Sequence, residues 1–199
     1  MLRKETTEAL VRRVLGDEAF SFSVVHYLVA EYVSPDGGCR VVLTLETSNG
    51  REVVEGQGSG FVDAAYKGLM HHHARAYSSL ASLTFTGFTI RGQMETGEPT
   101  TRAGLDAEVE VELSVRTLHG RTLAFRARDR STLAAAVAAI VQVVEHFINA
   151  ERAYVKLHRC LADAEARHRP DLIEEYTSGL AHLVEAQSFE TISARVRRG

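Results

Sequence analysis

Residues 55–69 read EGQGSGFVDAAYKGL, and they join a predicted strand to a predicted helix through Gly56, Gly58 and Gly60. Glycine lets the backbone approach a ligand closely, and the first turn of a helix offers unpaired N–H groups and the positive end of its dipole. Asp63 falls in that first turn. The spacing matches neither the dinucleotide-binding fingerprint nor a P-loop, because no Lys-Ser or Lys-Thr pair follows the glycines. The stretch therefore predicts a backbone pocket for a small anionic group.

The same order of elements occurs twice along the chain. Alternating apolar residues predict three strands and then a helix in each copy, with hairpin signals at Asn49-Gly50 and His119-Gly120. The predicted strands cover residues 20–33, 40–47 and 51–55, then 83–94, 107–117 and 121–126, with helices from 62 to about 76 and from 131 or 132 onward. A duplicated unit explains this pattern better than one continuous sheet. We therefore predict an α+β fold of two repeated βββα units with a C-terminal helical extension.

Helices are predicted at both ends of the chain. The first has Thr6 or Thr7 as its N-cap and stops at Gly16. One long helix is expected after residue 131, with a break after Asn149 as the alternative, and Pro170 permits a new helix. The patterns divide the chain into an N-terminal helix, two βββα units and the helical extension, over residues 1–19, 20–80, 81–157 and 158–199.

The two copies differ where the third strand meets the helix. The first copy has its glycines there, whereas the second has Ala127, Arg128, Asp129 and Arg130. The segment Asp63-Ala64-Ala65 is echoed in the second copy by residues 132–134. Only the first junction is therefore predicted to keep a permissive loop.

The overall composition is that of an ordinary soluble protein. The 199 residues are 45% hydrophobic and 25% charged, and the net charge of -3 gives no electrostatic reason to expect nucleic acid. Two distant cysteines, Cys39 and Cys160, suit a reducing compartment better than a disulfide framework. No secretory signal or bilayer-length apolar stretch is seen, so we expect a cytoplasmic protein with no membrane and no nucleic-acid partner.

Residues 58–64, Gly-Ser-Gly-Phe-Val-Asp-Ala, resemble a family motif of the type Gly-Asn-Gly-Pro-Val-Asp-Ala. The motif belongs to the C-terminal regulatory domain, or LeuA allosteric (dimerisation) domain, of the 2-isopropylmalate synthase and citramalate synthase family. Residues 103–114 and 138–154 support the resemblance, which covers roughly residues 20–154. The resemblance implies two βββα units per subunit, a homodimer, and feedback binding of a branched-chain amino acid such as leucine or isoleucine, or a related 2-oxo acid.

The implied ligand site lies at the glycine junction. A zwitterion needs N–H donors for its carboxylate, an acid or carbonyls for its ammonium, and an apolar wall. Asp63 has two readings, as a contact to the ammonium or as an acid that favours the helix N-terminus. The implied ligand-binding residues are Gly58, Ser59, Gly60, Val62, Asp63 and Ala64.

The resemblance also predicts that the chain is not an enzyme. The family's catalytic barrel carries a metal-binding His-x-His pair, and 199 residues leave no room for it. We therefore expect no catalytic residues, no metal and no cofactor, and a regulatory role in leucine or other branched-chain amino-acid biosynthesis, exerted on a separate condensing enzyme. The alternative is a structural or protein-interaction domain of the same fold that has lost its ligand, which Phe61 and the substituted second junction favour.

Two other side-chain groups are candidate sites. His71, His72 and His73 follow one another on a predicted helix, where neighbours point about 100° apart and cannot converge on one ion. They are expected at an exposed helix end, where histidines suit the C-terminal dipole. Ser59 lacks the Gly-x-Ser-x-Gly elbow and a matched base, so it is not expected to be a nucleophile.

Overall fold

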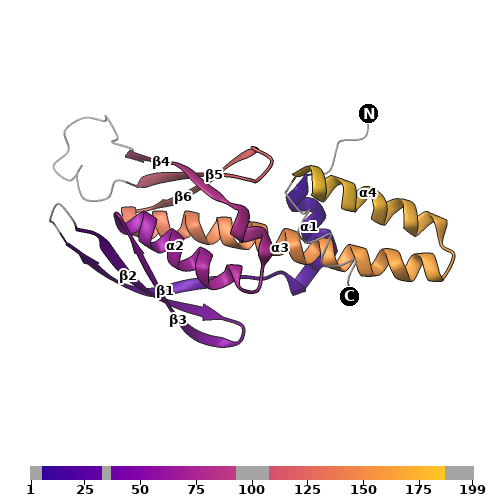
Figure 1. Ribbon diagram of the computed structural model, residues 1–199, viewed down its shortest axis with the longest axis horizontal. Coiled ribbons are helices and arrows are strands. Elements are labelled where there is room, and N and C mark those ends of the chain that lie inside the picture. The colour runs from indigo at the N-terminus through magenta and orange to yellow at the C-terminus, as the bar shows by residue number, and fades with distance from the viewer. Residues whose placement is uncertain (1–5, 33–36, 93–107, 187–199) are drawn as a thin grey trace, which may run out of the picture.

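The computed structural model describes residues 6–32, 37–92 and 108–186. In them the chain forms two similar halves, whose helices lie side by side between the two sheets, and a helical extension beyond the sheets (Figure 1). Each half contains a three-stranded antiparallel sheet with its strands in sequence order, followed by a helix. The predicted α+β class, with two βββα units and a C-terminal helical extension, is confirmed.

The strands and helices follow one another in the order that the sequence pattern predicts. The strands are β1 (Phe22–Glu31), β2 (Cys39–Thr47), β3 (Gly50–Gly58), β4 (Thr84–Gly92), β5 (Val109–Arg116) and β6 (Thr122–Asp129). The helices are α1 (Thr7–Leu15), α2 (Phe61–Ala74), α3 (Thr132–Ala166) and α4 (Pro170–Ala186), with 3-10 turns η1 (Gly16–Glu18) and η2 (Ser78–Ser82).

The duplication extends to the details of the strand pairing. The first strand of each sheet carries a register shift near its start, between Val24 and His26 in β1 and between Phe85 and Gly87 in β4. The third strands end at equivalent positions, because Gly58 pairs with Cys39 and Asp129 pairs with Val109. This register aligns α2 with α3 from their first residues, so Asp63 corresponds to Ala134. The counterpart of residues 63–65 is therefore residues 134–136, and the prediction of residues 132–134 was wrong by two positions.

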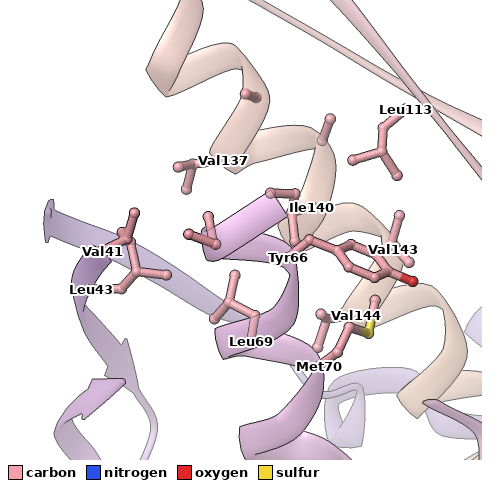
Figure 2. Close-up of a cluster of buried hydrophobic side chains, with 14 of the residues drawn as sticks. Val41, Leu43, Tyr66, Leu69, Met70, Leu113, Val137, Ile140, Val143 and Val144 are labelled. Carbon is pink, nitrogen blue, oxygen red and sulfur yellow. The ribbon is translucent and has the colours of Figure 1, made fainter. Parts of the chain in front are cut away.

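The main core lies between the two sheets, where α2 and α3 run side by side (Figure 1). The middle strands each turn alternate side chains toward these helices, as a sheet with one buried face must. The buried residues of β2 and β5 include Val41, Leu43, Leu45, Val111, Leu113 and Val115. Figure 2 shows some of these side chains meeting Tyr66 and Leu69 of α2 and Ile140 of α3.

The helix α3 is continuous, so the predicted alternative of a break after Asn149 is wrong. The side chain of Asn149 bonds to another segment instead of disturbing its own helix. Its Oδ1 accepts from the Phe20 N–H at 2.6 Å, and its Nδ2 donates to the Phe20 carbonyl at 2.8 Å. The polar residue thus anchors the chain entering β1 to the middle of α3.

A second, smaller core surrounds the C-terminal half of α3, against which α1 and α4 pack (Figure 1). Its buried members are Leu10, Leu15, Ala150, Ala153, Tyr154, Leu157 and Leu183. By length and composition α3 could cross a membrane, with a mean hydropathy of 1.6 over its most apolar window. However, 56% of that window is buried inside the fold, which is compatible with the core helix of a soluble domain.

Candidate functional site

The predicted ligand-binding residues lie together at the corner where β3 turns into α2, here called the glycine corner (residues 58–64). Gly58 ends the strand and Phe61 begins the helix, so the connecting loop consists of Ser59 and Gly60 alone. Ser59 is exposed, while Gly60 and Asp63 are partly exposed. The structure therefore brings the predicted residues into one short turn and leaves part of it open to solvent.

Two of the glycines are needed for packing between the strand and the helix. A Cβ atom on Gly56 would lie 2.0 Å from the carbonyl oxygen of Ala64, and one on Gly58 would lie 2.5 Å from the Ala64 nitrogen. Gly68 of α2 faces the same contact, since its Cβ would lie 3.0 Å from the Gly56 Cα. Hence Gly56 and Gly58 let α2 lie directly against β3, whereas Gly60 has open space around it.

Asp63 holds the glycine corner in shape. One of its carboxylate oxygens, Oδ2, accepts from the Ser59 N–H at 2.9 Å, from the Ser59 hydroxyl at 3.3 Å and from the Lys67 ammonium at 2.7 Å. Burial raises the pKa of Asp63, but the bonds from Lys67 and Ser59 outweigh it and hold the pKa below its ordinary value. The negative charge of Asp63 therefore lies at the N-terminus of α2, as the second of its two predicted roles requires.

The N-termini of α2 and α3 are capped differently. The N-cap of α3 is Ser131, whose hydroxyl accepts from the Ala134 N–H at 3.3 Å, and Asp129 accepts from the Ser131 N–H at 2.8 Å. The N-cap of α2 is Gly60, and no side chain caps this end. Backbone donors of the first turn therefore stay available for a ligand at the first corner and are partly used at the second.

Phe61 covers part of the glycine corner. Its side chain is 8% exposed, and its ring centroid lies 5.7 Å from that of Tyr27 on β1. Ala64 behind it is completely buried. The apolar wall beside the corner is thus already occupied by an aromatic pair, and no residue of the corner lines the clefts of about 700 and 450 Å³.

The three consecutive histidines were predicted at an exposed helix end, and this prediction is wrong for His73, which is buried. Only His71 and His72 reach the surface, where they bond to Arg75 at 3.3 Å and to Glu52 at 2.9 Å. His73 is 8% exposed and packs on the rings of the strand entry, Phe20 and Phe22.

The surroundings of His73 determine its ionisation. Burial, together with the nearby His72, lowers its pKa to about 4, so the ring is neutral near pH 7. No group of three histidine, cysteine or acidic side chains that could hold a metal ion occurs in the described part of the chain.

Comparison with known proteins adds no relative to this picture. No family model matches the chain, and no curated protein matches it.

Proposed function

We propose that this protein is a stand-alone regulatory-type domain, similar to the allosteric domain of 2-isopropylmalate synthase. It forms a homodimer in the cytoplasm and binds a branched-chain amino acid, such as leucine or isoleucine, or a related 2-oxo acid. Its role in branched-chain amino-acid biosynthesis is regulatory, through a separate condensing enzyme. The duplicated βββα arrangement and the motif at residues 58–64 support this proposal.

The observation that carries the proposal is the uncapped N-terminus of α2. Gly60 contributes no side chain there, and Ser59 beside it is exposed. A carboxylate is a suitable partner for such donors because the helix dipole and the N–H groups both favour an anion. The equivalent end of α3 is capped by Ser131, so a single site per chain is expected, at the first unit.

The outer faces of the two sheets support dimerisation through the first unit. On the outer face of the β1-β2-β3 sheet, Leu28 is 61% exposed and Val53 is 64% exposed. The same face also carries the ion pair between Arg40 and Glu55 at 2.6 Å. On the outer face of the β4-β5-β6 sheet, Arg126 pairs with Glu112 at 2.6 Å, and no large exposed apolar side chain lies beside them among the described residues. Large exposed apolar side chains on one face are typical of contact surfaces, whereas a charged face is suited to solvent.

Leu28→Arg is expected to weaken the dimer at least tenfold, because it places a charge in the proposed apolar contact. Thr89→Arg is the matched control, since Thr89 holds the same register position in β4 and pairs with Glu112 on the charged face. Sedimentation velocity over a concentration series measures both. A monomeric wild type, or equal effects of the two changes, would contradict dimerisation through this sheet.

One observation favours a second candidate function, a structural or protein-interaction domain without a ligand. The Phe61 ring, packed on Tyr27, fills the position where the apolar part of an amino acid would contact the corner. This candidate needs only the fold and its outer surfaces. The two candidates differ in whether a small molecule stabilises the protein.

Thermal unfolding with leucine, isoleucine, valine and their 2-oxo acids separates the two candidates. A ligand at about 100 times its dissociation constant is expected to stabilise the fold by roughly 2.7 kcal/mol and to raise the melting temperature by several degrees. Gly60→Ser should reduce this response, because the new hydroxyl can accept from the first-turn N–H groups of α2, just as Ser131 caps α3, and would compete with the ligand for them. If none of these compounds shifts the transition, the structural domain is the remaining reading.

A further inference from the structure

The cleft of about 450 Å³ lies where the two hydrophobic cores meet, and none of its lining residues belongs to the glycine corner. Three separate segments form it. Leu15 ends α1, Ala76 and Tyr77 follow α2, and residues 151–159 come from the middle of α3. The joint is where the βββα pair meets the helical extension, so an occupant would contact both.

The α3 wall of this cleft is cationic. Arg152, Lys156 and Arg159 follow one another at helical spacing and therefore share one side of the helix. Lys156 is paired with Glu18 at 3.0 Å. Among the described residues, Arg152 and Arg159 form no ion pair and no side-chain hydrogen bond. Arg152 is partly buried as a residue, whereas Arg159 is exposed. A guanidinium without an acceptor in a cleft is a ready partner for an anion, because Arg offers two parallel donors to a carboxylate.

The remaining walls restrict which anion fits. Two carboxylates, Glu18 and Glu151, also line the cleft, so its own lining has three cations and two carboxylates. Glu18 and Arg152 also line the cleft of about 700 Å³, which carries further carboxylates. Glu151 is fixed in place, since it is 7% exposed and accepts from the Ser79 N–H at 2.9 Å. The arrangement favours a monoanion over a phosphate dianion, because the two carboxylates repel a dianion more strongly.

The apolar part of the lining indicates the rest of the ligand. Leu15, Val155 and the Tyr77 ring contribute carbon surface beside the arginine. Small-molecule sites combine such surface with a few polar groups that fix orientation. We propose that this cleft binds a small organic acid, with its carboxylate on Arg152 and its aliphatic or aromatic body against Leu15, Val155 and Tyr77.

Binding at this place ties the βββα pair to the helical extension. The ligand would join η1 and the end of α2 to α3 beside the existing contact between Glu18 and Lys156. The site is separate from the glycine corner and does not depend on the amino-acid proposal, so either can fail without the other.

Titration with 4-methylpentanoate, followed by calorimetry and by thermal unfolding, tests this inference. The wild type is expected to bind it saturably, and at least tenfold more tightly than acetate, the uncharged 4-methylpentanamide or inorganic phosphate. Arg152→Met should weaken binding at least tenfold, because it keeps the length and apolar surface of the side chain but removes the charge. Arg116→Met, an exposed arginine on β5 outside the cleft, should bind as the wild type does.

The inference would be overturned by no saturable binding of 4-methylpentanoate, by unchanged binding in Arg152→Met, or by phosphate binding as tight as that of the organic acid. If Arg152→Met is too unstable to titrate, the exposed Arg159→Met serves instead, with an expected loss of at least threefold. Gly60→Ser, which alters the glycine corner, should leave this binding unchanged, and a loss there would place the acid at the corner.

Discussion

Gly56→Ala is expected to lower the free energy of unfolding by about 3 kcal/mol, the upper end of the usual cost of overpacking. The new Cβ would lie 2.0 Å from the Ala64 oxygen, 2.9 Å from the Ala64 carbonyl carbon and 3.0 Å from the Gly68 Cα. All three are backbone atoms, so no side chain can move aside, and α2 would have to shift away from β3. Urea unfolding of the purified variant measures the change.

Gly92→Ala is the matched control for this prediction. Gly92 also lies in a strand, its φ is not in the left-handed region, and nothing lies within 4 Å of a Cβ built on it. Its stability is expected to stay within about 0.5 kcal/mol of the wild type. The close packing of α2 on β3 would be contradicted if the two substitutions had similar effects.

Acidification is expected to destabilise the protein through His73. Its pKa is about 4 in the folded protein, against an ordinary value of 6.5 in the unfolded chain, because the buried ring resists protonation. The unfolded state therefore takes up the proton first, and stability that is present above pH 6.5 is lost as the pH falls toward 4. The loss should approach roughly 2–3 kcal/mol and then level off below pH 4.

His73→Phe isolates this effect, since it keeps an aromatic ring against Phe20 and Phe22 but cannot be protonated. The difference in unfolding free energy between wild type and variant, measured by urea at several pH values, should change between pH 6.5 and 4. Groups that do not interact with His73 titrate alike in both proteins. Glu145, for example, whose pKa is raised by burial despite a bond from the Phe22 N–H, cancels in the difference. A difference that does not vary with pH would contradict the assignment.

Local patterns were sufficient to predict the repeated fold. Alternation such as Val41, Leu43 and Leu45 reports which face of a strand is buried, and the same order of signals occurs twice. The sequence alone does not decide whether α3 is continuous, because a polar Asn149 is compatible both with a helix break and with a bond across to Phe20. Such a distinction depends on the partner segment and not on the local sequence.

The site was predictable only in part. The motif located the glycine corner, but Gly56 and Gly58 are required by short distances between β3 and α2, which sequence spacing does not reveal. His73 was expected at the surface because its burial depends on Phe20 and Phe22, about fifty residues earlier. The cleft at Arg152 was missed because it is assembled from the ends of α1 and α2 and the middle of α3.

Amide NMR spectra recorded with increasing leucine or isoleucine test the proposed function most directly, because they report each backbone N–H separately. We predict saturable shifts centred on Ser59, Gly60, Phe61 and Val62, with none at the capped counterpart around Ser131. The second unit thus serves as an internal control within one spectrum. Spectra that stay unchanged at the glycine corner with saturating amounts of both amino acids would contradict the account.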